Sequence, residues 1–260
     1  MALEDLFGLT GQVSLVTGAG RGLGRAAAIG LAEAGSDLVI VSRNVAELEE
    51  LKHEIETLGR QALVLPADLA DYRNVERLIS PIMEEYGRLD ILLNNAAIIH
   101  RESLDEISWD SFDSQMAVNM KAPFALCRAA VAQMKKQGRG KIINVTSVGA
   151  TRGADHFSVY SMCKAGLSIF TRSLAVELAR AGVNIQANCI GPGSFDTPMN
   201  QNAGQKNSEH FKRLMSIIPM GRNGHPDEFK GLVVFLAGNG SNYITGQDIY
   251  IDGGALASWV

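Results

Sequence analysis

Several features that mark special classes of protein are missing from this sequence. Three cysteines occur in 260 residues, Cys127, Cys163 and Cys189, at spacings that match no metal-binding pair and argue against a disulfide framework. No stretch approaches the ~18 uncharged apolar residues of a membrane span. The first ten residues include acids and no basic segment, so they do not resemble a signal peptide. We therefore expect free thiols, no membrane partner, no metal and a cytoplasmic location.

An excess of charge of one sign is also missing. The chain has 24 Lys and Arg against 28 Asp and Glu, which gives a formal net charge of −4. Such a balance provides no basic footprint for a nucleic acid, so we expect no nucleic-acid partner. There is no Gly/Ser/Pro-rich linker, tandem repeat or low-complexity tract. The length suits one large α/β domain, and we predict that residues 1–260 form a single domain.

Short apolar, β-branched runs alternate with helical stretches along the chain. This alternation is typical of a parallel sheet covered by helices on both faces. One long gap, residues 194–225, has a polar, Gly-rich middle and is predicted to be a substrate lid. The predicted strands are 13–17, 38–41, 62–65, 91–93, 141–145, 183–187 and 248–251, and the predicted helices are 24–33, 45–58, 75–86, 109–136, 158–181 and 226–237.

A glycine-rich turn connects the first predicted strand to the first predicted helix. Glycines at such a turn let backbone N–H groups approach a pyrophosphate, and the helix N-terminus attracts its charge. The glycines are spaced GxxxGxG and not GxGxxG, so a tight turn without a ligand is the alternative. The candidate cofactor-binding residues of this turn are Gly18, Arg21, Gly22, Leu23 and Gly24.

The end of the second predicted strand indicates which dinucleotide would bind. An acid at this place bonds the ribose 2′-hydroxyl of NAD, whereas an arginine accommodates the 2′-phosphate of NADP. The strand ends in Ser42 and Arg43, with no carboxylate, and Arg21 is a second nearby cation. We therefore predict NADP in preference to NAD, with two solvated arginines as the alternative.

Ser147, Tyr160 and Lys164 form a candidate catalytic group. Ser147 follows a buried strand, at the edge of the sheet where ligands bind. Tyr160 and Lys164 are four residues apart and share one helical face. A nearby ammonium lowers the pKa of a phenol, which then exchanges protons near neutral pH. The alternative is an ordinary amphipathic helix beside an ordinary strand end.

Together these motifs resemble the short-chain dehydrogenase/reductase family over nearly the whole chain. Thr17–Gly24 is similar to the family's TGxxxGxG turn, and Ser147, Tyr160 and Lys164 match its serine and YxxxK motif. Further family-like segments are Asp68-Leu69, Asn94–Ala97 with alanine in place of the last glycine, Asn119, Pro192-Gly193, Thr197 and Gly246–Gly254.

The resemblance implies a Rossmann fold with a seven-stranded parallel sheet and hydride transfer between a secondary alcohol and a ketone. Tyr160 would be the general acid or base, Lys164 would bind the nicotinamide ribose and lower the tyrosine pKa, and Ser147 would orient the substrate oxygen. Asn119 would hold a backbone bend and a relay water. The family also implies a homotetramer or homodimer, paired through the long helices. Implied cofactor contacts are Asp68, Leu69, Asn95, Tyr160, Lys164, Pro192, Gly193 and Thr197.

Within the family the chain is most similar to sugar-acid dehydrogenases of the gluconate type. Its cues are Ile98–Arg101 after the NNA segment, with Gly221-Arg222 and Pro226 after the lid. Arg101 is a candidate donor to a substrate carboxylate, with an exposed surface arginine as the alternative. Four further residues either contact the substrate or have ordinary roles as lid anchors and solvated loop residues: Phe195, Met199, His100 and His156.

Two other functions compete with a sugar-acid dehydrogenase. A 3-oxoacyl thioester (acyl-carrier) reductase would share every catalytic residue, so the catalytic motifs do not separate the two enzymes. A non-catalytic cofactor-binding regulatory protein on the same fold would typically lose the tyrosine or the lysine. The chain retains Asn119, Ser147, Tyr160 and Lys164, which favours an enzyme.

Overall fold

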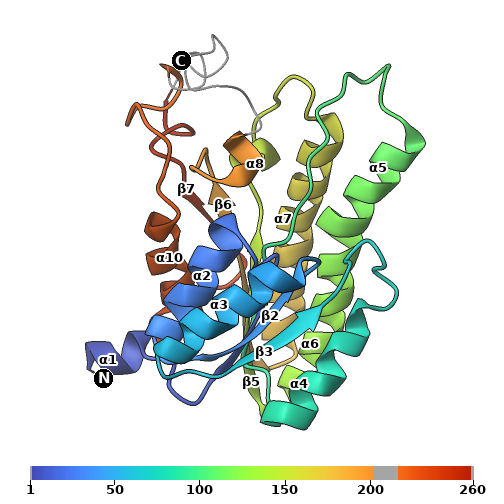
Figure 1. Ribbon diagram of the computed structural model, residues 1–260. Helices are drawn as coiled ribbons and strands as arrows, with labels where there is room; N and C mark the ends of the chain where they lie inside the picture. Colours follow the sequence, from blue (N-terminus) through green and yellow to red (C-terminus); the bar gives the residue numbers. More distant parts are fainter. Residues whose placement is uncertain (1, 202–215, 259–260) are drawn as a thin grey trace.

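A seven-stranded parallel sheet forms the centre of the computed structural model, which describes residues 2–201 and 216–258. The strand order is β3-β2-β1-β4-β5-β6-β7, with every neighbouring pair parallel (Figure 1). This arrangement confirms the predicted Rossmann fold. The strands are β1 (Val13–Thr17), β2 (Asp37–Ser42), β3 (Ala62–Pro66), β4 (Ile91–Asn94), β5 (Arg139–Val145), β6 (Asn184–Pro192) and β7 (Asp248–Ile251).

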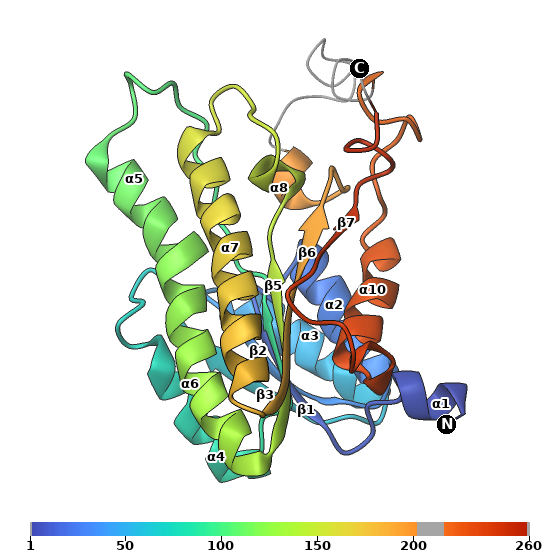
Figure 2. The same cartoon turned by 180° about the vertical axis from the view of Figure 1, so that it is seen from behind.

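Helices cover both faces of this sheet, as the apolar character of the central strands requires. Helices α2 (Gly22–Glu33), α3 (Val45–Thr57) and α10 (Asp227–Ala237) lie on one face. The other face carries α4 (Ile79–Tyr86), α6 (Ala122–Gln137) and α7 (Ser158–Arg180), with α5 (Trp109–Met116) beside α7 (Figure 2). Shorter elements are α1 (Leu3–Phe7), α8 (Pro198–Gln201) and the single turns Val75–Leu78, Val148–Ala150 and Asn239–Ser241.

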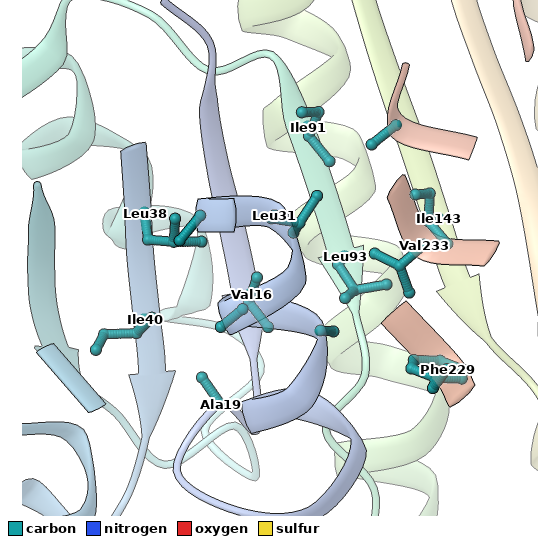
Figure 3. Packing of buried hydrophobic residues seen from close by; sticks show 14 of the residues in the cluster. Val16, Ala19, Leu31, Leu38, Ile40, Ile91, Leu93, Ile143, Phe229 and Val233 are labelled. Carbon is teal, nitrogen blue, oxygen red and sulfur yellow. The ribbon is translucent and has the colours of Figure 1, made fainter. Parts of the chain in front are cut away.

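Two apolar cores result, one on each side of the sheet. Figure 3 shows the first core, in which Val16 and Leu93 of the central strands pack against Leu31 of α2 and Phe229 and Val233 of α10. The second core packs β1, β4 and β5 against α4, α6 and α7. Both cores are built mainly from the strands and the helices that cover them, so they fix the positions of the strands.

Three of the departures from the expected elements lie near the carboxyl edge of the sheet or in the predicted lid. The predicted helix 109–136 is divided by a π-helical turn, Ala117–Lys121, between α5 and α6. Strand β6 extends five residues beyond the predicted 183–187, to Pro192, because it pairs with β7 on its second edge. In the predicted lid, α8 forms one turn, and residues 202–215 lie outside the described residues.

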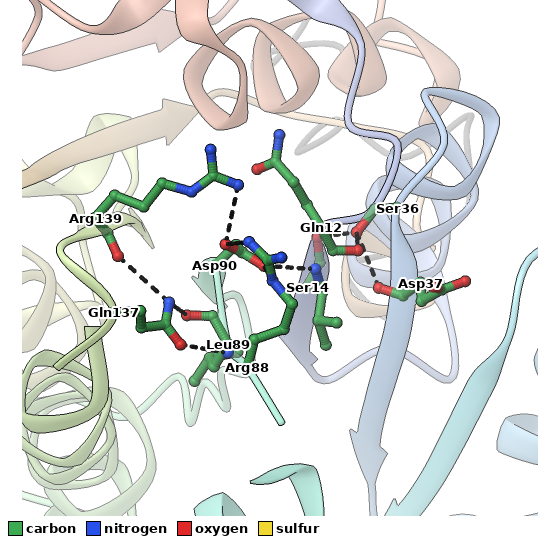
Figure 4. Close-up of polar contacts among 10 residues, drawn as sticks. Gln12, Ser14, Ser36, Asp37, Arg88, Leu89, Asp90, Gln137 and Arg139 are labelled. Atoms are coloured by element: carbon green, nitrogen blue, oxygen red, sulfur yellow. Dashed lines mark hydrogen bonds and ion pairs between the residues drawn. The ribbon is translucent and has the colours of Figure 1, made fainter. Parts of the chain in front are cut away.

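A buried carboxylate organises the opposite, amino-terminal edge of the sheet. Asp90 is 2% exposed and accepts hydrogen bonds from the Val13 backbone N–H at 3.0 Å and from Arg88 Nε and Nη2, both at 2.7 Å (Figure 4). Arg139 adds a contact at 3.3 Å. The carboxylate thus joins the start of β1 to the residues that precede β4 and begin β5. Bonds to a charged acceptor contribute more than neutral ones, so this cluster stabilises the strand order.

Replacing Asp90 with asparagine should lower the free energy of unfolding by about 2–3 kcal/mol, because a neutral amide cannot accept all of these bonds. Denaturant titration followed by circular dichroism measures the change. Asp113→Asn, at an exposed position of α5, is the matched control and should change stability by less than about 0.5 kcal/mol. Equal stability of the two variants would contradict the structural role of Asp90.

Candidate active site

A wide cleft opens along the carboxyl edge of the sheet. It has a volume of about 1250 Å³, larger than the ~300–1,000 Å³ of typical small-molecule pockets. Its walls come from the glycine turn after β1 and the segments that follow β2, β3, β4, β5 and β6. In open parallel sheets, ligands bind where the strand order reverses, which here is the boundary between β1 and β4. The cleft therefore has the size and position to hold a dinucleotide together with a small substrate.

The glycine turn is shaped for close approach to a ligand. Gly18 and Gly22 have φ angles of +65° and +58°, which side chains rarely tolerate. A Cβ on Gly24 would collide with the Gly18 carbonyl oxygen. Asn95 supports the turn from β4, since its Nδ2 donates to the Thr17 carbonyl at 2.9 Å. The sequence predicted Asn95 as a cofactor contact. It lines the cleft, and its amide also holds the glycine turn in place.

An anion can approach the start of α2 directly. Arg21 is the N-cap residue and makes no side-chain capping bond within the described chain, so the first N–H groups of the helix stay open. Ser42 and Arg43, at the end of β2, line the same part of the cleft. Arg21 and Arg43 are exposed and form no salt bridge with any described residue. Asp68, Leu69 and Leu23, also predicted as cofactor contacts, line the cleft as well.

Ser147, Tyr160 and Lys164 all line the cleft and lie close to one another. Ser147 lies two residues after the end of β5, and its hydroxyl accepts a hydrogen bond from the Gly149 N–H at 3.1 Å. Lys164 lies one turn after Tyr160 on α7, with its Nζ 5.7 Å from the centre of the tyrosine ring. The same Nζ donates to the Val145 carbonyl at 2.7 Å. The structure therefore brings the three predicted catalytic residues to one place.

Burial has the largest effect on the pKa values of both ionisable side chains in this group, Tyr160 and Lys164. It raises the pKa of Tyr160 above the ordinary value of 10.0, while interaction with the Ser147 hydroxyl acts in the opposite direction. Lys164 is 2% exposed, and burial lowers its pKa to about 8. The sequence predicted that Lys164 lowers the tyrosine pKa. In the chain without a cofactor, burial raises the Tyr160 pKa, and the predicted lowering by Lys164 together with a bound nicotinamide stays a prediction.

Asn119 lies in the π-helical turn between α5 and α6 and forms hydrogen bonds to a segment that lines the cleft. It is fully buried, its Nδ2 donates to the Ile98 carbonyl at 2.8 Å, and its Oδ1 accepts from the Ile98 N–H at 3.0 Å. π-Helical turns often occur at functional sites because they redirect one side chain. Asn119 therefore holds the backbone of Ile98, which lines the cleft, while its predicted roles at a backbone bend and a relay water stay predictions.

A cation lies at the outer part of the cleft. Arg101 is exposed, and its guanidinium lies 5.0 Å from the centre of the Phe157 ring, which contacts the Tyr160 ring edge-on at 6.0 Å. His156 lines the cleft with a φ of +60°, an unusual angle for a residue with a side chain. His100 does not line the cleft, which favours its alternative as a solvated loop residue.

The segment after β6 forms the remaining wall. Pro192, Gly193 and Thr197 line the cleft, as predicted, and Thr197 packs against Gly22 of the glycine turn. Phe195 lines the cleft too, although it is only 3% exposed and packs edge-on against Phe229 of α10, as its alternative role of an anchor requires. Met199 also lines the cleft and is 41% exposed.

Several residues that line the cleft were not predicted from the motifs, among them Phe157, Glu47 and Ser194. The ring of Phe157 contacts the Arg101 guanidinium, and its place at the N-cap of α7, three residues before Tyr160, was a usable signal. Glu47 comes from the first turn of α3, and Ser194 has a buried hydroxyl with no hydrogen-bond partner within the described chain. Neither belongs to a recognisable motif, because their positions depend on tertiary packing.

Metal-binding clusters and membrane-spanning helices are both missing from the described part of the chain. Residues 2–201 and 216–258 contain no group of three or more His, Cys, Asp or Glu side chains placed to hold a metal ion. In the same ranges, no helix has the length and apolar character needed to cross a membrane.

Comparisons with known proteins identify the family of this chain. The family model described as "Enoyl-(Acyl carrier protein) reductase" matches residues 18–255. A 2-dehydro-3-deoxy-D-gluconate 5-dehydrogenase from Dickeya dadantii is 38% identical, over 97% of this chain and 98% of that protein. A 3-oxoacyl-[acyl-carrier-protein] reductase from Thermotoga maritima is 35% identical, over 95% of this chain and 99% of that one.

The fold of this chain also matches that of a solved structure. The crystal structure of a gluconate 5-dehydrogenase from Burkholderia cenocepacia, in complex with NADP and tartrate, superposes with a TM-score of 0.92. It is 34% identical and covers 99% of this chain and 100% of that one. Matches of this extent, together with the assembled serine, tyrosine and lysine, show that the chain belongs to the short-chain dehydrogenase/reductase family.

Proposed function

We propose that this oxidoreductase is an NADP(H)-dependent enzyme that interconverts a secondary alcohol and a ketone, with Tyr160 as general acid and base. The observation that carries the proposal is the placement of Tyr160 beside Ser147 and the buried Lys164 in a dinucleotide-sized cleft. A buried ammonium without a carboxylate partner among the described residues is costly, and such groups are frequent at functional sites.

The residues present fit a dinucleotide phosphate. Gly18 and Gly22 keep the turn open, the uncapped start of α2 offers N–H groups, and Arg21 and Arg43 provide two cations without partners in the described chain. A 2′-phosphate would meet these arginines at the end of β2. Related structures that contain NADP support the same cofactor for this chain.

A bound nicotinamide supplies hydride transfer at its C4 atom. The protein handles the accompanying proton: Tyr160 Oη donates it to the substrate oxygen in reduction and accepts it in oxidation. Ser147 holds that oxygen next to the phenol. Lys164 contributes positive charge, and together with a cationic nicotinamide it would offset the burial that otherwise raises the Tyr160 pKa. Asn119 fixes the Ile98 backbone and so the shape of the cleft behind the reacting atoms.

A sugar acid or a related small hydroxy or keto compound is the substrate class that we propose. Arg101 is an exposed cation at the outer part of the cleft, held over Phe157 at 5.0 Å, where it can bind a carboxylate in a bidentate way. Relatives that are sugar-acid dehydrogenases support this class. A 3-oxoacyl thioester remains the alternative, and related acyl-carrier reductases favour it. Testing keto acids, polyols and acyl thioesters as substrates distinguishes the two.

We also propose a second copy of the chain as partner, in a homodimer or homotetramer. Apolar side chains on α7 are exposed at seven-residue intervals, at Met162, Ile169 and Val176, which places them on one helical face. Phe124 of α6 extends this face through its contact with Phe170. A face of this kind is typical of protein interfaces. The cytoplasmic location stays a prediction from the sequence.

Replacing Tyr160 with phenylalanine should reduce turnover by about 10²–10⁴-fold, because the proton donor is lost. The Kd of NADPH, followed by its fluorescence, should stay within about threefold. Tyr243→Phe, at a fully exposed position outside the cleft, is the matched control and should retain full activity. Retained turnover in Tyr160→Phe would remove the acid/base role and would reopen the regulatory alternative.

Replacing Arg43 with aspartate should weaken NADPH binding by about 10–100-fold while leaving NADH nearly unchanged, because a 2′-phosphate would meet a carboxylate. Dissociation constants for both dinucleotides measure the ratio. Arg77→Asp makes the same charge change outside the cleft and should not alter it. An unchanged ratio in Arg43→Asp would show that this arginine does not contact the phosphate.

Replacing Arg101 with methionine should raise the KM of a sugar keto acid by about tenfold or more, because a charged hydrogen-bond donor is lost. The KM of a neutral keto sugar should change little, and Arg101→Lys should restore part of the difference. Steady-state kinetics with both substrates provide the comparison. Equal changes for the two substrates would indicate that Arg101 does not bind a carboxylate.

A further inference from the structure

A carboxylate lies at the adenosine end of the cleft, although none is present at the end of β2. A Cβ built on Gly20 would be 2.5 Å from Oε2 of Glu47 and 3.1 Å from Oγ of Ser42. The Glu47 side chain therefore lies directly over the glycine turn and close to the Ser42 hydroxyl. It lines the same cleft as Arg21 and Arg43.

Helix capping does not account for this position of Glu47. The cap of α3 is Asn44, whose Oδ1 accepts hydrogen bonds from the N–H groups of Ala46 and Glu47 at 3.1 and 3.4 Å. A glutamate at this place would complete a capping box by bonding back to the Asn44 N–H. Among the described residues, the Glu47 carboxylate accepts no hydrogen bond and forms no salt bridge. Its charge is directed at the glycine turn and not at its own helix.

This carboxylate opposes the two arginines in the choice of cofactor. A 2′-phosphate carries a charge of about −1.5 to −2 at pH 7, so Arg21 and Arg43 attract it and Glu47 repels it. The ribose 2′-hydroxyl of NAD(H) is neutral, and it can donate a hydrogen bond to a carboxylate. The same three side chains therefore favour NADP(H) less strongly than two arginines alone would.

We propose that Glu47 is a specificity-determining residue, which weakens NADP(H) binding relative to NAD(H) and lets the enzyme use both dinucleotides. The inference rests on the proposed function, because it requires that a dinucleotide occupies this cleft. The inference also extends that function. Arg21 and Arg43 alone would give a strict preference for NADP(H), and Glu47 makes that preference weaker.

The test measures the Kd of NADPH and of NADH by nicotinamide fluorescence, without substrate, for the wild type and for Glu47→Gln. The amide keeps the shape and an acceptor oxygen but removes the charge. We expect NADPH to bind about tenfold more tightly to the variant, and NADH to change by less than about twofold. The gain should shrink at 1 M salt, where charges are screened within about 3 Å. Glu49→Gln removes the same charge from an exposed position of α3, outside the cleft, and should leave both constants unchanged.

The possible outcomes separate this inference from the proposed function. If the wild type binds both dinucleotides and the ratio of their constants is the same in Glu47→Gln and in Glu47→Ala, the role of Glu47 is overturned. The same holds if Glu49→Gln shifts the ratio as much as Glu47→Gln does, because a general effect of net charge would then explain it. If the wild type binds neither dinucleotide, the proposed function fails, and with it the inference.

Discussion

A buried ammonium group beside a buried phenol is the interaction on which the site depends. Lys164 Nζ is removed from water and donates to the Val145 carbonyl at the end of β5, one helical turn from Tyr160. Burial disfavours the charged form of both groups, which raises the pKa of Tyr160 and lowers that of Lys164 to about 8, so near neutral pH the phenol is protonated and the lysine still carries its charge. Additional positive charge in the cleft would then have a large effect on the phenol, because the local dielectric constant is low.

The fold explains why these groups meet. β5 directs Ser147 to the carboxyl edge of the sheet, and α7 packs against β6 so that Tyr160 and Lys164 face the same edge. Asn119 fixes the end of the β4 segment from the π-helical turn, and Asn95 fixes the glycine turn from the same segment. A lowered lysine pKa does not by itself identify the site. Burial also lowers the pKa of Lys141 to about 8, at the opposite end of β5, where Ser241 and Asn242 accept its hydrogen bonds.

The sequence predicted what depends on local patterns and motif order. The alternation of strands and helices, the glycine turn and the Ser147, Tyr160 and Lys164 group follow from spacing that neighbouring residues determine. It did not predict properties that arise from packing between distant segments. The raised pKa of Tyr160 depends on how completely the folded chain covers it, and the contact of Glu47 with Gly20 depends on how α3 lies against the turn. The π-helical turn was missed because one extra residue in a helix barely disturbs its apolar pattern.

The most direct test of this account is the titration of Tyr160 itself, with and without oxidised dinucleotide. The chain has five tyrosines, so NMR of protein labelled with ¹³C at the tyrosine Cζ atoms can resolve them, and the signal missing from Tyr160→Phe gives the assignment. In the free protein the pKa of Tyr160 should lie above the ordinary 10.0, and saturation with NADP⁺ should lower it below that value. In Lys164→Met most of this decrease should be lost. A pKa of Tyr160 that stays the same with and without the dinucleotide would contradict the account.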